Sequence, residues 1–137
     1  MDWGNEAYTG GITAVYAEEL TREAIFDAIY QRRCYATTGQ RIILDFKADG
    51  HVMGAEYQSK DDPHFFVKVI GTAPLQSVTL VRNNQDYYQA EGNGHKMELT
   101  FQCGKEEPPR ETDCYYVRVI QQDGEMAWSS PIWITIN

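Results

Sequence analysis

Histidines are the first residues to consider for chemistry, because imidazoles bind metals and transfer protons near neutral pH. His51, His64 and His95 form no H-x-H or H-x-x-x-H pair. His51 follows an Asp-Gly turn signal, His64 opens a strand-like segment and His95 follows Gly-Asn-Gly. We therefore expect these histidines to be solvated at loops and strand ends.

Carboxylates gather at three places: residues 61–64, which read Asp-Asp-Pro-His, and the pairs Glu18-Glu19 and Glu106-Glu107. Hard cations need several oxygen ligands, and residues 61–64 could supply two for weak calcium binding without having EF-hand spacing. A general acid–base pair must face across a site, whereas neighbours on a strand point to opposite faces. Solvated polar segments are the simpler interpretation.

The cysteines and the nucleophile motifs add no catalytic candidate. Arg32 and Arg33 could lower the pKa of Cys34, but a helix C-terminus there would disfavour a thiolate. Cys103 and Cys114 could pair across a loop, although only Cys103 shares the inward phase of its segment. No G-x-S-x-G, P-loop or G-x-G-x-x-G motif occurs. We expect no catalytic residue, no metal ligand and no cofactor in this chain.

Aromatic residues, including nine Tyr, make up 12% of the chain. Several occupy outward or uncertain positions of the predicted strands, and we select Tyr116, Trp128 and Trp133 as candidate binding or interface residues. Such a face can stack on sugar rings or form an interdomain contact. Both alternatives remain open from the sequence.

Length and charge set the class of protein. The 137 residues fit one domain with a short extension. The net charge of -8 argues against nucleic acid or an anionic membrane as a partner. No apolar run approaches the roughly 20 residues that span a bilayer. The acidic N-terminus is unlike a signal peptide. We expect a soluble domain.

A helix is predicted from about Thr21 to Cys34, after an extended lead-in over residues 1–20. Thr21 suits the N-cap, because its hydroxyl can accept a hydrogen bond from a backbone N–H of the first turn. The apolar residues follow helical spacing: Ala24, Ile25, Ala28 and Ile29. One helix cannot bury this face alone, so we expect it to dock on another part of the protein.

From Arg41 onward, apolar and polar residues alternate with a period of two, as in strands with one face on a core. Turn signals such as Asp49-Gly50 and Asn83-Asn84 separate most of these segments. The pattern predicts a mainly β fold: an antiparallel immunoglobulin/fibronectin-III-like β-sandwich of about seven or eight strands, preceded by one α-helix. Tyr115 is expected to hydrogen-bond back to the loop before its strand, a structural role.

Three segments carry a more specific resemblance: GGITAVYAEELTREAIFDAI at residues 10–29, RRCYATTG at residues 32–39 and DGEMAWSSPIW at residues 123–133. Together they resemble the C-terminal region of a poorly characterised bacterial and archaeal family. That family is related to the polymerase-and-histidinol-phosphatase (PHP) metallohydrolases. The resemblance implies a distorted barrel whose His, Asp and Glu residues hold divalent metals upstream of this chain.

On this resemblance, residues 1–39 are the terminal segment and last helix of the barrel domain, and residues 40–137 are the C-terminal β-sandwich domain. The implied function is a non-catalytic accessory domain of a PHP-type, metal-dependent phosphoesterase-like protein. The missing barrel domain, or a second copy of the chain, would be its partner. The alternative is a stand-alone sandwich module that binds a glycan or a protein.

Overall fold

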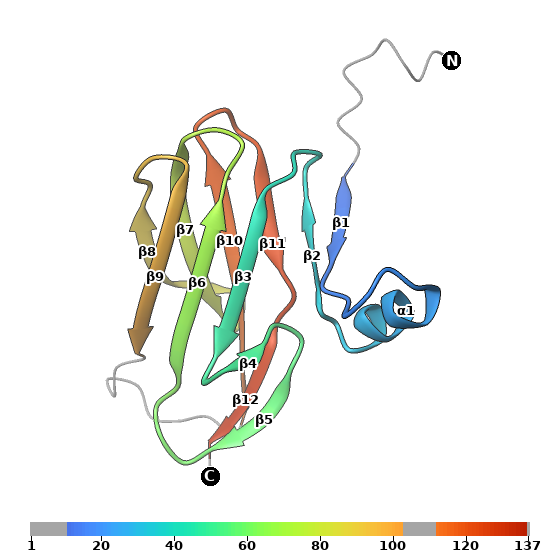
Figure 1. Ribbon diagram of the computed structural model, residues 1–137. Helices are drawn as coiled ribbons and strands as arrows, with labels where there is room; N and C mark the ends of the chain where they lie inside the picture. The colour runs from blue at the N-terminus through green and yellow to red at the C-terminus, as the bar shows by residue number, and fades with distance from the viewer. Residues whose placement is uncertain (1–10, 103–111, 137) are drawn as a thin grey trace.

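Alternating apolar residues give this chain two stacked β-sheets, seen in the computed structural model of residues 11–102 and 112–136 (Figure 1). The fold is mainly β with one helix among the described residues, which confirms the predicted class. The elements in chain order are β1 (Ile12–Val15), α1 (Arg22–Tyr30), β2 (Cys34–Thr37), β3 (Ile43–Ala48), β4 (His51–Val52), β5 (Glu56–Ser59), β6 (His64–Ile70), β7 (Leu75–Arg82), β8 (Gln85–Glu91), β9 (Lys96–Gln102), β10 (Thr112–Gln121), β11 (Met126–Ser129) and β12 (Ile132–Ile136).

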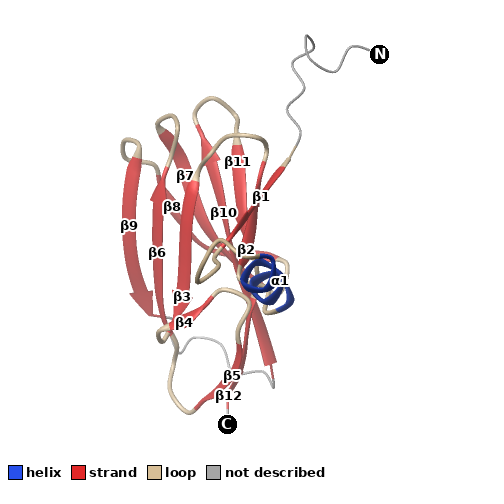
Figure 2. Ribbon diagram, turned by 45° about the vertical axis from the view of Figure 1, so that its right-hand side comes forward, coloured by secondary structure: helices blue, strands red, loops and turns tan. Residues whose placement is uncertain are grey.

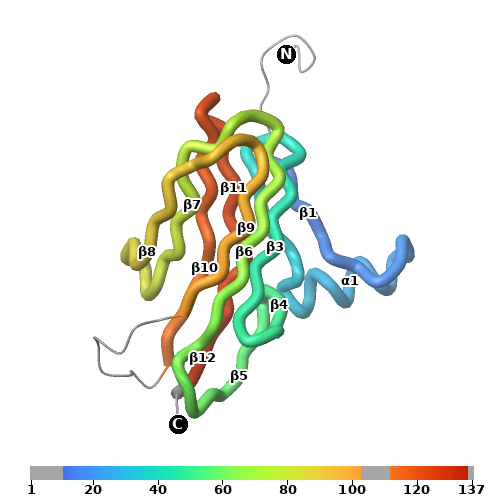
Figure 3. The backbone as a smooth tube through the Cα atoms, turned by 60° about the vertical axis from the view of Figure 1, so that its left-hand side comes forward, coloured from blue at the N-terminus to red at the C-terminus, as the bar shows by residue number. Residues whose placement is uncertain are grey.

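The smaller sheet has the order β4-β3-β6-β9, with antiparallel pairing throughout. The larger sheet runs β1-β2-β11-β10-β12-β5, and β7 and β8 continue it on the other side of β10. Strands β11 and β12 pair with different lengths of β10, because Pro131 interrupts them. Figures 2 and 3 show the two layers from different sides, and Figure 3 shows α1 protruding on the side where β1 lies.

Side chains that alternate along β3, β6 and β10 fill the space between the sheets. Phe65 lies at the centre, 2% exposed. Its ring centroid is 5.9 Å from that of Phe46, 5.5 Å from that of Phe101 and 4.7 Å from that of Tyr115. Aromatic pairs at such separations add to the stability from area burial.

The tight turns follow the predicted signals. Asp49 and Gly50 have φ of 49° and 81°, and Asn83 and Asn84 have φ of 51° and 67°. These left-handed conformations suit Gly, Asn and Asp, and their twist matches that of the flanking strands. The turns therefore fix the hairpins β3–β4 and β7–β8.

The described residues form twelve strands rather than seven or eight, and β12 pairs with β5 in parallel rather than antiparallel. Two predicted elements also differ in their bounds. The helix ends at Tyr30, not Cys34, because Arg32 turns left-handed at φ 61° and Cys34 begins β2. The lead-in is not all loop, since Ile12–Val15 form β1, which pairs with β2. Strand β2 in turn pairs with β11. Residues 12–37 thus extend the larger sheet, while a domain boundary at residue 39 stays a prediction.

Candidate functional site

The three selected aromatics lie on one face of the larger sheet. Along β10, Tyr116 and Arg118 alternate with buried Tyr115 and Val117 and so point away from the core. Trp128 on β11 is opposite Arg118, and Trp133 on β12 is opposite Cys114. Tyr116 therefore lies diagonally between the two tryptophans, within reach of long side chains. All three are half-buried.

An arginine already covers one of these rings. The guanidinium carbon of Arg32 lies 5.1 Å from the ring centroid of Trp133, a cation–π distance. Its Nε also donates to the carbonyl oxygen of Gly54 at 3.0 Å, and one terminal nitrogen is 3.4 Å from a Glu56 carboxylate oxygen. Trp133 therefore contributes to the packing of the loop between α1 and β2.

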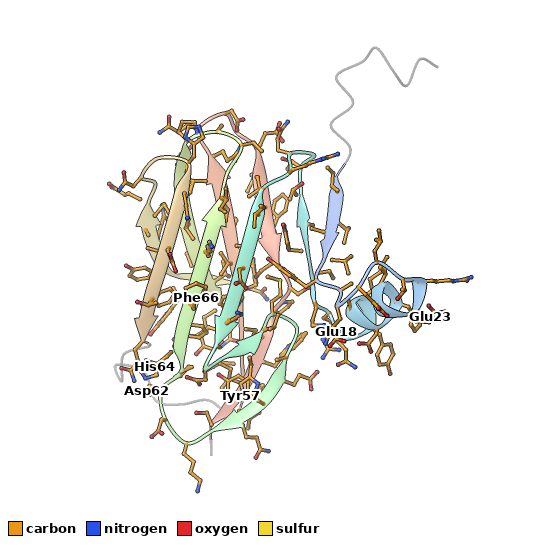
Figure 4. The ribbon with its side chains drawn as sticks, in the orientation of Figure 1. Glu18, Glu23, Tyr57, Asp62, His64 and Phe66 are labelled. Carbon is orange, nitrogen blue, oxygen red and sulfur yellow. The ribbon has the colours of Figure 1, made fainter. Side chains whose placement is uncertain are left out.

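The histidines and acids do not converge where the structure describes them. The His51 ring stacks on Tyr57 with centroids 4.0 Å apart, and the Tyr57 hydroxyl donates to Asp49 at 2.8 Å. Figure 4 places His64 beside Asp62 near the lower end of β6, far from Glu18 and Glu23 at the helix. Within residues 11–102 and 112–136, no three His, Cys, Asp or Glu side chains are grouped to hold a metal ion.

The described thiols are free and partly covered. Cys34 Sγ is 3.7 Å from Ser130 Oγ, and that hydroxyl donates to the Cys34 carbonyl oxygen at 2.6 Å. Burial raises the pKa of the Cys114 thiol, which disfavours its reactive thiolate form. Cys103 and Glu106-Glu107 lie outside the described residues.

Hydrogen bonds from two tyrosines connect the segment of β1 and β2 to the chain at the start of β3. The Tyr16 hydroxyl donates to the carbonyl oxygen of Leu44, and the Tyr35 hydroxyl donates to that of Ile42 at 2.8 Å. Burial raises the pKa of Tyr16 above its ordinary value of 10.0, and electrostatic coupling to the neighbouring acidic groups Tyr35 and Asp45 raises it further. Burial likewise raises the pKa of Tyr35. Both groups therefore act as neutral donors.

Tyr115 is buried against Phe65, and its predicted hydrogen bond to the preceding loop stays a prediction.

Helix α1 begins with Thr21 as its N-cap, whose Oγ1 accepts from the Ala24 backbone nitrogen at 3.2 Å. Of the expected docking face, Ala28 is fully buried and Ala24 and Ile25 are half-buried, whereas Ile29 is 51% exposed. Because α1 contacts β1, part of this face packs within the domain.

A second apolar face of α1 was not predicted from the sequence. We define the α1 patch as the four large apolar residues exposed on or just before this helix: Leu20, Phe26, Ile29 and Tyr30. The Phe26 and Tyr30 rings stack with centroids 6.4 Å apart. The i, i+4 spacing of Phe26 and Tyr30 is the sequence signal for this face. The face through Ala28 has the same helical spacing, so spacing alone does not predict which face is exposed.

An apolar cleft of about 300 Å³ opens where β1 and β2 meet β3. Its apolar lining includes Ile12, Ala14, Tyr35, Ile42 and Ile43. Ile12 and Ile43 at its rim are 41% and 48% exposed. The side of the molecule with β1 and α1 therefore carries most of the large apolar side chains that the described residues expose.

No helix in the described part of the chain is long and apolar enough to cross a membrane.

Fold and surface define a β-sandwich-type domain with a protruding helix, and comparison with known proteins gives it relatives. Residues 2–63 match a family described as "Protein of unknown function (DUF3604)". The whole chain is 36% identical to an uncharacterized protein of Chlamydia trachomatis serovar D and 34% identical to one of Chlamydia muridarum. A Chlamydia pneumoniae protein is 33% identical over 95% of the chain.

The chain spans only 24% of the length of the first two relatives and 23% of the third. No solved structure matches it. The chain is therefore similar to one part of much longer proteins whose names state no activity.

Proposed function

We propose that this chain is a non-catalytic accessory domain of a longer, PHP-type, metal-dependent phosphoesterase-like protein, in which it has a structural or interaction role. The observation that carries the proposal is that the entire chain aligns with about a quarter of each of two Chlamydia proteins. The resemblance of residues 10–29, 32–39 and 123–133 to the C-terminal region of a PHP-related family supports the enzyme class.

Divalent metals would belong to the part of the longer protein outside this chain. The described residues do not fit such a metal, because none of their His, Cys, Asp and Glu side chains form a group of three around a common point. We therefore assign no step of phosphoester hydrolysis to them. Their contribution would be contact surface, such as the aromatic face and the α1 patch.

The proposal is tested by comparing this chain with the longer C. trachomatis relative in a p-nitrophenyl phosphate assay with manganese or zinc. We expect metal-dependent turnover by the relative and none by the chain alone. Turnover by the chain that persists through a second purification would contradict its non-catalytic role. A relative inactive on this and other phosphoesters would contradict the enzyme class.

A stand-alone binding module for a glycan or protein is the second candidate. It is favoured by the single face that holds Tyr116, Trp128 and Trp133. Calorimetry with a panel of oligosaccharides should then show binding that is lost in Trp128→Ala and kept in Tyr88→Ala, an exposed aromatic on β8. A flat response across the panel would remove the glycan version.

A further inference from the structure

The side chains of the α1 patch have the highest exposed fractions among the large apolar side chains of the described residues. Leu20 is 94% exposed, Phe26 and Tyr30 are each 69% exposed, and Ile29 is 51% exposed. Scattered exposed apolar residues are normal, but a contiguous group marks an interaction surface. These four residues come from one helix of nine residues and the position just before its N-cap.

The orientation of α1 makes the patch unusual. A helix turns by about 100° per residue, so Phe26 and Ala28 lie nearly on opposite sides of the axis. Ala28 is buried toward the domain, whereas Phe26 and Tyr30 stack on each other in solvent. A helix that packs only on its own domain directs a polar face to solvent. Helix α1 instead has apolar residues on both sides, as expected for a helix between two partners. Figure 1 shows this helix protruding beside β1 and β2.

We propose that the α1 patch is the contact through which this domain docks on the neighbouring domain of the same longer polypeptide, in an apolar groove with a basic rim. The inference rests on the proposed function for the existence of that neighbour. It also changes the docking residues, because Ala28 of the expected face is already buried. The patch keeps Ile29 from the expected face and adds Leu20, Phe26 and Tyr30 as the residues that meet the partner.

The length of the relatives favours a covalently linked occupant. The chain covers 24% of the C. trachomatis protein, so most of that polypeptide lies outside the match. A linked domain is present at an effective concentration in the millimolar range, and docking then needs far less interface than binding from solution.

The small area of the patch argues against a second copy as the occupant. Phe26 and Tyr30 are each 69% exposed, so together they offer roughly 200–350 Å² of accessible area, and with Leu20 and Ile29 the patch offers on the order of 500 Å². A stable complex between free proteins needs about 800 Å² on each partner. The net charge of -8 on each copy also opposes self-association.

Charge around α1 indicates the chemistry of the groove. Three exposed acids, Glu18, Glu19 and Glu23, lie beside the patch and outnumber the exposed Arg22 of the first turn. Asp27 is already paired, 2.7 Å from Arg33. Interfaces combine an apolar centre with a polar rim of complementary charge. The partner groove is therefore apolar at its floor, where Phe26 and Tyr30 insert, and carries Lys or Arg at its rim.

The test compares hydrogen exchange of α1 in this chain alone and in a chimera, the C. trachomatis relative with this chain in place of its matched quarter. We expect exchange of the α1 amides to slow by at least about tenfold in the chimera. The double variant Phe26→Ser/Tyr30→Ser should remove this protection. Tyr88→Ser, an exposed aromatic on β8, should keep it.

Equal α1 exchange in the isolated chain and in the chimera would overturn the docking proposal. So would a dimer of the isolated chain, seen by light scattering and abolished by Phe26→Ser/Tyr30→Ser, because the occupant would then be a second copy. Both readouts are independent of the phosphoesterase assay. Failure of docking is thus distinguishable from failure of the proposed function.

Discussion

Gln121 shows at the scale of a single residue how a polar side chain is accommodated in this core. It is fully buried at the end of β10, where its Oε1 accepts from the Thr72 backbone nitrogen at 2.8 Å. Its Nε2 donates to Thr72 Oγ1 at 3.2 Å and to Asp123 at 3.1 Å. Both ends of the amide are therefore satisfied, as buried polar groups require.

Replacing this amide should expose the cost of the missing bonds. We expect Gln121→Ala to lower the free energy of unfolding by about 2 kcal/mol, because the Thr72 N–H loses its acceptor. Urea denaturation measures the change. Gln122→Ala, at the exposed neighbour, is the control and should change stability by less than about 0.5 kcal/mol. Equal effects of the two substitutions would show that the network contributes nothing specific.

Tyr16 links stability to alkaline pH. Its pKa in the folded protein lies above its ordinary value of 10.0. Above pH 10 the unfolded chain has released this proton while the folded chain keeps it. The folded state then binds more protons, and the free energy of unfolding falls as pH rises. The stability that the raised pKa of Tyr16 contributes is therefore fully present below pH 10 and is lost as pH rises through the folded-state pKa.

We expect Tyr16→Phe to flatten this pH dependence, because phenylalanine has no proton to release. Urea midpoints between pH 8 and 11 would measure the slope in both proteins. The variant should also be less stable at pH 8, where it lacks the hydrogen bond to the Leu44 carbonyl. An unchanged slope would show that Tyr16 ionises alike in both states.

The alternation of apolar and polar residues predicted which side chains point away from the core, but not which residues these side chains contact. The alternation of β10 placed Tyr116 outside and Tyr115 inside, as observed. The position of Arg32 over Trp133 joins residues a hundred apart in sequence. It depends on the left-handed turn at Arg32, a conformation that nothing in that residue's type favours.

At the scale of elements, the β turns of this fold were predictable and the close contacts between loops were not. Gly50 sits in a predicted Asp-Gly turn at φ 81°, with nothing near the position of a Cβ. Gly54, at φ 93°, touches the loop after α1, where a Cβ would lie 2.4 Å from the Arg32 carbonyl oxygen. Only the folded arrangement shows that this second glycine is needed for space.

Alanine at these two glycines should separate backbone strain from steric conflict. Gly50→Ala carries only the left-handed penalty, about 1–2 kcal/mol. Gly54→Ala adds a clash with backbone that cannot move as a side chain does, and we expect a loss of at least about 3 kcal/mol. Thermal and urea unfolding of both variants measure the difference. Similar losses of unfolding free energy in the two variants would mean that the loop at Gln31–Arg32 moves aside at little energetic cost.

The helix was predictable at its start and not at its end. Thr21 and the apolar spacing mark the beginning of α1. Its end depends on β2, which starts at Cys34 and takes its backbone partners from β1 and β11. Such short strands are stabilised by pairing rather than by local propensity. Strand β11 itself gave no alternation long enough to predict.

For the whole molecule, the larger sheet joins segments that are far apart in the sequence. Strand β2, at residues 34–37, pairs with β11, at residues 126–129. Tyr35 on β2 is 7% exposed and belongs to the core between the sheets. The segment before the predicted domain boundary at residue 39 is thus also an edge of this sheet, so this boundary and a folding boundary are separate questions.

Deletion of residues 1–39 distinguishes these two kinds of boundary. We expect the shortened chain to lose at least about 3 kcal/mol of unfolding free energy, because it leaves β11 unpaired on one side and removes the buried Tyr35 ring. Tyr35→Ala should account for much of that loss, whereas Ala36→Ser, exposed on the same strand, should not. Urea denaturation and hydrogen exchange of β11 measure all three. A shortened chain that is as stable as the whole chain, with the β11 amides still protected, would establish residue 39 as a folding boundary. In that case β1, α1 and β2 would not be needed for the sandwich to fold.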